Sequence, residues 1–169
     1  MLQNLIIRNE SRADHAAISQ VIEQAFNDQQ YSSHTEQFIV HALRDAQQLT
    51  ISLVAVLNQD IVGHIAISPV SISSGVEGWF GLGPIAVAPE WQHHGIGSAL
   101  MQAALKQLEA AGAAGCIVLG DPHFYAQFGF QPINNLILED VPAEYFQALS
   151  FDGKFPQGIV TYHAAFSAT

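Results

Sequence analysis

The residues with the clearest chemical potential lie near the middle of the chain, where two closely spaced glycines follow a β-branched run. The first backbone N–H groups of a helix have no partner within the helix and lie at the positive end of its dipole, so they can hold a pyrophosphate without lysine. Glycines let the backbone approach such an anion closely. The candidate binding residues of this segment are Gln92, His93, His94, Gly95, Ile96, Gly97 and Ser98.

The glycine spacing alone leaves a second interpretation open, because two glycines at a helix start can serve only a tight turn. The chain contains no G-x-x-x-x-G-K-[ST], and no G-x-G-x-x-G follows its first predicted strand. Both absences disfavour nucleotide hydrolysis and hydride transfer with a dinucleotide. Coenzyme A also carries a pyrophosphate, and it is the ligand that this segment suggests.

The strand before this segment contains Gly83-Pro84. Proline cannot donate to a ladder and glycine weakens a strand, so we expect a bulge and a separation from the neighbouring strand. The freed polar groups of Ile85, Ala86 and Val87 then need another partner. The amide chain of pantetheine could pair there as an added strand, with its thioester in the gap. An ordinary edge strand that carries a proline is the alternative.

The elements that must position these residues can be read from periodicity and turn signals. Apolar residues at helical spacing predict helices after Ser11, after Ser33 and from about Gly95 to Gly112. Ser33 to Glu36 fits the capping box S-x-x-E. A short helix is expected at 123–128, and residues 133–156 fit no pattern. The predicted strands are 5–8, 50–57, 61–72, 79–87, 116–119 and 159–166.

These residues resemble the GNAT superfamily of N-acetyltransferases, whose acetyl-CoA signature is Q/R-x-x-G-x-G/A after a strand that ends in V-x-P. Residues 92–97 match it in full, and Tyr125-Ala126-Gln127-Phe128-Gly129-Phe130 is similar to the family's Y-x-x-x-G-F. The run L-G-D-P at 119–122, with Phe124-Tyr125 and Leu82-Gly83-Pro84, looks like a subgroup of predicted bacterial acetyltransferases. The resemblance extends from the first strand to about Phe130.

The resemblance implies a fold of the α+β class with α/β/α layers. We expect a mixed, mainly antiparallel sheet, flanked by helices and splayed between the strand ending at Val87 and the strand ending at Leu119. With 169 residues, of which 49% are hydrophobic, the chain has the size of one domain. We therefore expect a single GNAT-like domain over residues 1–169.

The family resemblance also implies roles in catalysis. The enzyme would be an acetyltransferase that uses acetyl-CoA as cosubstrate, and an amine would attack the thioester directly. Tyr125 stands where the family's tyrosine commonly protonates the leaving thiolate. A phenol titrates at about 10 and a thiol at about 8.5, so the transfer is only slightly uphill. A backbone N–H near Ile85 or Ala86 would stabilise the oxyanion.

The base that takes the proton of the amine is not assigned by the sequence. Candidates are His64, Glu77 and Glu36, and each also has a structural explanation. The acceptor, a small-molecule or peptide amine, is equally open. Residues 28–36 and 133–156 are expected to line its pocket. A non-catalytic acyl-CoA binding or sensing module, which has no use for Tyr125, and a structural subunit are the alternatives.

Composition limits the partners and the location. Five basic and fifteen acidic residues give a net charge of -10, which disfavours nucleic acid and membrane surfaces. Cys116 is the only cysteine, so an internal disulfide is impossible, and the histidines form no metal-binding pattern. No run is long and apolar enough to span a membrane, so we expect a cytoplasmic protein. Because the histidines and the cysteine form no metal-binding pattern, we expect no metal. A homodimer formed through the last strand is conceivable.

Overall fold

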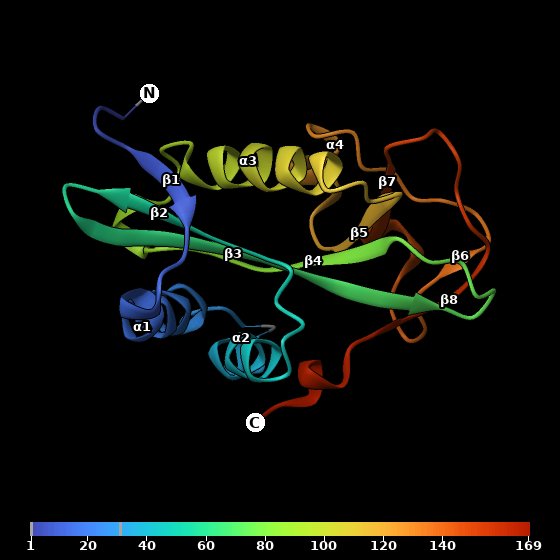
Figure 1. Ribbon diagram of the computed structural model, residues 1–169, viewed down its shortest axis with the longest axis horizontal. Coiled ribbons are helices and arrows are strands. Elements are labelled where there is room, and N and C mark those ends of the chain that lie inside the picture. Colours follow the sequence, from blue (N-terminus) through green and yellow to red (C-terminus); the bar gives the residue numbers. More distant parts are fainter. Residues whose placement is uncertain (1, 31) are drawn as a thin grey trace.

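The computed structural model describes residues 2–30 and 32–169, and its centre is an eight-stranded sheet (Figure 1). The main strand order is β1-β2-β3-β4-β5-β7, and β8 pairs with both β3 and β6. Only the β4–β5 and β6–β8 pairs are parallel. The strands are β1 (Ile6–Asn9), β2 (Ile51–Leu57), β3 (Asp60–Ile72), β4 (Trp79–Val87), β5 (Gly115–Leu119), β6 (Leu136–Ile137), β7 (Phe146–Ser150) and β8 (Gly158–Tyr162).

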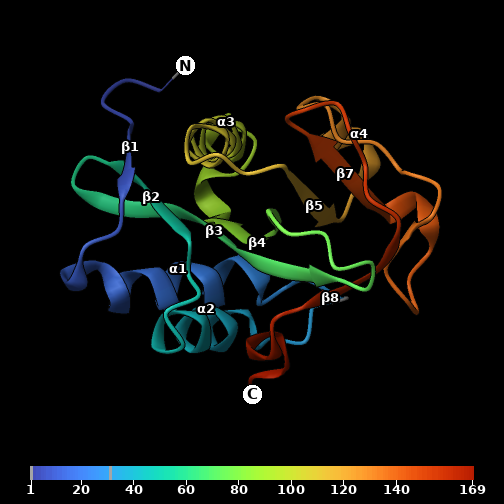
Figure 2. The ribbon, with the colours of Figure 1, turned by 45° about the vertical axis from the view of Figure 1, so that its right-hand side comes forward.

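Helices cover both faces of the sheet (Figures 1 and 2). On one face lies α3 (Ile96–Ala110), and α1 (His15–Phe26) and α2 (Glu36–Asp45) lie on the other. The short helix α4 (Pro122–Ala126) follows β5. The apolar stripe of α3 packs on β2 and β3 in one core, and α1 packs on the opposite face in another. This arrangement confirms the predicted layers and the mixed, mainly antiparallel sheet.

The sheet splits between β4 and β5, as predicted. These strands pair only where Trp79, Phe80 and Gly81 lie beside residues 115–117, near the start of each strand. Beyond Gly81, β4 stays paired with β3, with a register shift that accommodates Gly83-Pro84 as a bulge. Among the described residues, the second half of β4 therefore has no strand partner on the side of β5 and presents a free edge there.

The segment that fitted no pattern, residues 133–156, contains two strands. The longer one, β7, pairs antiparallel with all of β5 and forms an edge of the main sheet. It is covered on both faces, because Phe146 and Ala148 pack in a core with Trp79 and Leu149 packs against the core beneath α3. Buried neighbours from distant parts of the chain therefore define this strand, and no local alternation marks it.

Two local predictions were wrong. The last strand was expected to reach Phe166, but β8 ends at Tyr162, because the ring of His163 accepts a hydrogen bond from the backbone N–H of Ala165 at 3.0 Å and starts a 3₁₀ turn. The capping box at Ser33 is also absent. Both carboxylate oxygens of Glu36 lie 2.8 Å from the hydroxyl of Ser32, which donates to them instead.

A homodimer formed through the last strand would need an unpaired edge of β8. This strand pairs with β3 along one edge, and its other edge is covered by β6 at Gly158 and Ile159. In the described part of the chain, no helix has the length and hydropathy that crossing a membrane requires.

Candidate active site

The glycine-containing segment forms a turn that leads into α3, and its amides are free. Gly95 is the N-cap of α3 and has a φ of 85°, a conformation that glycine adopts without strain. The first bond of the helix runs from the N–H of Ala99 to the carbonyl of Gly95 at 3.1 Å. Within the described residues, the amides of 93–98 donate to no other protein group. They are unpaired donors at a helix N-terminus, the feature on which the predicted anion site depends.

Two side chains of the turn bond or pack locally. The side-chain amide of Gln92 donates to the carbonyl of Val87 at 3.1 Å and ties the turn to the end of β4. His94 is exposed; its Nδ1 lies 2.8 Å from the carbonyl of Gln92, and its ring meets the edge of Trp91. The imidazole of His94 is thus engaged within the turn, and its backbone N–H has no acceptor among the described residues.

The free edge of β4 presents alternate residues to the split. The N–H of Ala88 donates to the carbonyl of Val62 at 2.8 Å, so by strand alternation Ala86 also bonds toward β3. Ile85 and Val87 have their polar backbone groups on the opposite side, toward the split. The side chain of Ala86 is buried with α1. Ala86 therefore belongs to the scaffold, and Ile85 is the better placed of the two predicted oxyanion donors.

Tyr125 lies across the split, in α4. Asp121 caps this helix by accepting a hydrogen bond from the N–H of His123 at 2.9 Å. The ring of Tyr125 packs against Phe124 and Phe130. A Cβ at Gly120 would lie 2.6 Å from its Cε2, so this ring position requires glycine there. Burial raises the pKa of Tyr125 to about 12, and the phenol keeps its proton at neutral pH.

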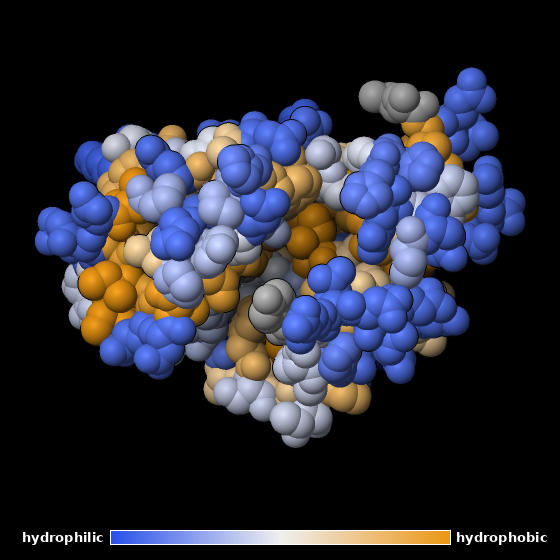
Figure 3. Space-filling model, turned by 180° about the vertical axis from the view of Figure 1, so that it is seen from behind, coloured by the Kyte–Doolittle hydropathy of each residue, from blue (hydrophilic) through white to orange (hydrophobic). Residues whose placement is uncertain are grey.

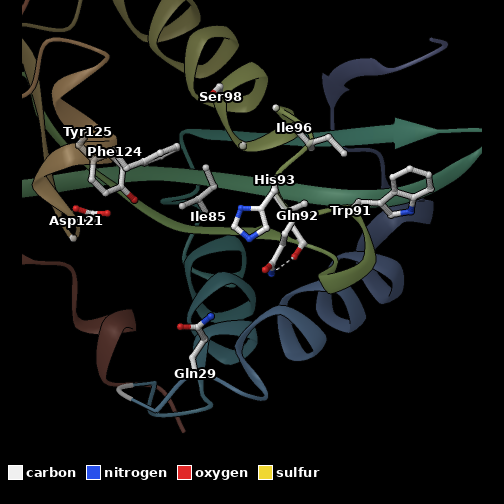
Figure 4. Close-up of a pocket in the computed structure, with 14 residues that line it drawn as sticks. Gln29, Ile85, Trp91, Gln92, His93, Ile96, Ser98, Asp121, Phe124 and Tyr125 are labelled. Carbon is white, nitrogen blue, oxygen red and sulfur yellow. Dashed lines mark hydrogen bonds between the residues drawn. The ribbon is translucent and has the colours of Figure 1, made fainter. Parts of the chain in front are cut away.

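A cavity of about 570 Å³, here named the first cavity, joins the turn, the free edge of β4 and Tyr125. In Figure 4, Phe124 and Tyr125 lie on one side of it and Gln92 and His93 on the other. Of the predicted site residues, only Ala86 and His94 do not line it. The lining residues are Gln29, Ile85, Val87, Trp91, Gln92, His93, Gly95, Ile96, Gly97, Ser98, Gly120, Asp121, Phe124 and Tyr125.

Some of these residues were not among the predicted binding residues. Gly120, Asp121 and Phe124 belong to the quoted motifs, and the capping signal Asp121-Pro122 could have placed them at the site. Trp91 directly precedes the signature and lies outside the residues that match it. Gln29 follows α1 and lies within residues 28–36, which were expected to line the acceptor pocket; it lines the first cavity and not the second.

A second cavity of about 520 Å³ lies beside the bulge of β4 and shares Ile85 and Tyr125 with the first. From behind, the molecule has a hollow near its middle, with hydrophobic residues at its base (Figure 3). The walls of the second cavity come from distant segments of the chain and are mostly apolar or aromatic. The lining residues are Phe26, Glu36, Ile39, Leu82, Gly83, Pro84, Ile85, Leu119, Tyr125, Leu138, Glu139, Tyr162 and Phe166.

The three candidate bases have separate locations. His64 is fully buried, its Nε2 lies 2.8 Å from the hydroxyl of Ser52, and burial lowers its pKa to about 4. It lines neither cavity. Glu77 lies in the exposed turn before β4 and also lines neither. Glu36 lines the second cavity, which reaches Tyr125.

Cys116 is completely buried in the core beneath α3, and burial raises the pKa of its thiol. It lines neither cavity, as expected for a cysteine that packs as a small hydrophobe. Across residues 2–30 and 32–169, no group of three or more His, Cys, Asp and Glu side chains could hold a metal ion.

Comparison with known proteins identifies the family. A sequence model of the acetyltransferase (GNAT) domain matches residues 48–132. The chain belongs to the GNAT acetyltransferases. It is 32% identical over 128 residues to the uncharacterized N-acetyltransferase YhbS of Escherichia coli K12, with 75% of this chain and 74% of YhbS covered.

Solved structures agree with this GNAT membership. A GNAT family acetyltransferase from Brucella melitensis, crystallised with acetyl-CoA, is 46% identical, with 98% of this chain and 99% of that one covered and a TM-score of 0.87. YhbS of Escherichia coli, crystallised with CoA, is 29% identical over 96% of this chain and 92% of its own, also with a TM-score of 0.87. These relatives confirm the predicted fold and the enzyme class, an acetyltransferase with acetyl-CoA as cosubstrate.

Proposed function

We propose that this GNAT protein transfers the acetyl group of acetyl-CoA to a primary amine, a small molecule or a peptide, by direct attack. The observation that carries the proposal is that the turn with free amides (residues 93 and 95–98), the free edge of β4 and Tyr125 all border the first cavity. The Brucella relative was crystallised with acetyl-CoA, which supports the assignment of this cavity to the cosubstrate. The proposal extends to one domain over residues 1–169 that acts in the cytoplasm.

The cosubstrate fits the groups that the cavity offers. The amides of residues 93–98 are the donors for its pyrophosphate, since they have no acceptor of their own. A Cβ at Gly97 would lie 3.8 Å from the ring of Phe124 and 3.9 Å from Val87, so this glycine keeps open the space between the two walls. The N–H and C=O of Ile85 and the N–H of Val87 are left for the amides of the pantetheine arm, whereas the carbonyl of Val87 already accepts from the side chain of Gln92.

The chemical step follows from what flanks the shared end of the two cavities. The N–H of Ile85 donates to the carbonyl oxygen of the thioester as negative charge develops there. The C–N bond to the acceptor forms, the C–S bond breaks, and Tyr125 gives its proton to the leaving sulfur. The amine loses a proton to water or to a side chain of the second cavity, and solvent reprotonates the phenolate. Positioning both reactants in adjoining cavities supplies part of the acceleration.

Direct attack is favoured over an acetyl-cysteine intermediate because no cysteine lines either cavity. The single cysteine, Cys116, lies outside both cavities and is held protonated by burial. Incubation with acetyl-CoA alone should therefore leave the protein mass unchanged, as mass spectrometry can check. A stoichiometric acetyl adduct that is discharged by amine would overturn direct attack.

The activity itself is tested with a panel of primary amines and acetyl-CoA, by following release of the CoA thiol. We expect amine-dependent release, and calorimetry should show binding of CoA without any amine. Tight CoA binding with no release for any amine would contradict the proposed transfer. Absence of CoA binding would contradict the assignment of the first cavity.

A further inference from the structure

The second cavity has a composition that restricts what it can bind. Among the described residues that line it, the charged ones are Glu36 and Glu139, and none is basic. The remaining wall is apolar or aromatic, and it includes Leu119, whose side chain is 45% exposed at the mouth of the split. Exposed apolar surface inside a concave site marks a binding surface.

Glu36 is placed to meet a cation inside this cavity. It is the first residue of α2, is partly buried, and belongs to an element on the opposite face of the sheet from α4, which carries Tyr125 (Figure 1). The hydroxyl of Ser32 donates to its carboxylate, with both oxygens at 2.8 Å, and this bond orients the group. Each carboxylate oxygen has a further lone pair for a second donor. Glu139 is exposed at the rim and is the weaker of the two carboxylates.

The apolar wall has its own fixed geometry. The rings of Tyr162 and Phe166 pack with centroids 4.8 Å apart. A Cβ at Gly81 would lie 2.7 Å from Cε1 of Tyr162, so glycine at that position lets the ring lie over the last residue of β4 that pairs with β5. Together with Phe26 and Leu138, these rings form a surface that suits a flat or bulky hydrocarbon group.

We propose that the acceptor is a primary amine on an apolar or aromatic body without a carboxylate, and that Glu36 holds its ammonium group beside Tyr125. This inference rests on the acetyl transfer proposed above. A second ammonium group could pair only with Glu139 at the exposed rim, where an ion pair adds little, and deeper in the cavity it would lie against the apolar wall, which disfavours polyamines. An amino acid would place its carboxylate in a cavity that has no cation to pair with it. Glu36 acts as a positioning residue here, because it orders the amine and is not itself bonded to the reacting carbon.

Matched amines test this substrate class with thiol release as the readout. 2-Phenylethylamine carries the body and one charge; phenylalanine adds a carboxylate, ethylamine lacks the body, and 1,4-diaminobutane replaces the body with a second charge. We expect kcat/KM for 2-phenylethylamine to exceed that of each other amine by about tenfold or more. Equal or better turnover of phenylalanine or of the diamine would overturn the substrate class and leave the proposed transfer intact.

The role of Glu36 is tested by Glu36→Gln, which keeps the shape and a hydrogen bond to Ser32 and removes the charge. KM for 2-phenylethylamine should rise about 10- to 100-fold with little change in kcat, since a charge-assisted bond is lost. Glu77→Gln, outside both cavities, is the matched control and should leave KM unchanged. Both variants should keep the wild-type thermal shift with CoA, which excludes misfolding. An unchanged KM for Glu36→Gln would remove Glu36 from amine recognition.

If no amine in the panel releases thiol although CoA binds, the transfer activity fails and the substrate class fails with it. If release occurs only with amines outside the proposed class, the transfer stands and the inference about the second cavity is wrong. The two failures are therefore distinguishable in the same experiment.

Discussion

The two cavities meet at Ile85 and Tyr125, yet the recognition that we propose for them differs in kind. The first depends on backbone amides and on glycines that leave room for a ligand, all within one short stretch of chain. The second depends on side chains from α1, α2, the bulge of β4, α4 and the C-terminal region. A cosubstrate site built on backbone can stay constant while the side-chain site changes, and so one fold can serve different acceptors.

The shared residue Tyr125 should have the largest effect on turnover. Tyr125→Phe removes the proton donor for the leaving thiolate and keeps the ring packed between Phe124 and Phe130. We expect kcat to fall by about 10²- to 10⁴-fold. The Kd for CoA, measured by calorimetry, should change less than about threefold, because the pyrophosphate site is elsewhere. Undiminished kcat would show that Tyr125 is not the proton donor to the leaving thiolate.

Low pH should destabilise the fold around both cavities, because His64 is buried in β3, next to the part of β4 that borders both of them. His64 is opposite Ala86 in β4, and burial lowers its pKa to about 4, whereas the unfolded value is about 6.5. The unfolded chain therefore binds more protons, so this stabilisation is complete above pH 6.5 and is lost as the pH falls toward 4.

Urea unfolding should show a decrease of about 2 kcal/mol in the free energy of unfolding between pH 7 and pH 5 from this residue. His64→Gln, whose amide does not titrate in this range, is the comparison. A variant with the same pH dependence as the wild type would assign the loss to other groups. Asp14 and Glu10, whose pKa values are lowered by Arg8 and Arg44 respectively, contribute mainly at more acidic pH.

A side chain that fills the first cavity should weaken CoA binding without altering the second cavity. Gly97→Leu places a side chain between Phe124 and Val87, where a Cβ makes only ordinary contacts, so the fold should survive. We expect the Kd for CoA to rise about 10- to 100-fold, with loss of the thermal shift at moderate CoA concentration. Gln102→Leu, on the exposed face of the same helix, should bind CoA as the wild type does. Equal binding by both variants would place CoA elsewhere.

The difference between a backbone site and a side-chain site also explains which parts of the molecule could be predicted from the sequence. A backbone site can be predicted from local sequence, because Gly95 and Gly97 are needed at fixed positions beside a helix start. The bulge is likewise predicted by two adjacent residues, Gly83-Pro84. The second cavity has no such local signal, since Glu36, Leu138 and Tyr162 become neighbours only through tertiary packing. The strand β7 was missed for the same reason. Ser33 and Ser32 were interchanged as partners of Glu36, because side-chain orientation decides between adjacent hydroxyls.

The smallest predicted effect concerns the apolar wall of the second cavity. Phe166→Ala removes the ring that packs on Tyr162. We expect kcat/KM to fall about five- to tenfold for 2-phenylethylamine and less than twofold for ethylamine, because only the larger amine contacts that wall. Phe38→Ala, which truncates a 45% exposed phenylalanine on α2 outside both cavities, should affect neither. A uniform loss for both amines would mean that Phe166 supports the fold and does not select the acceptor.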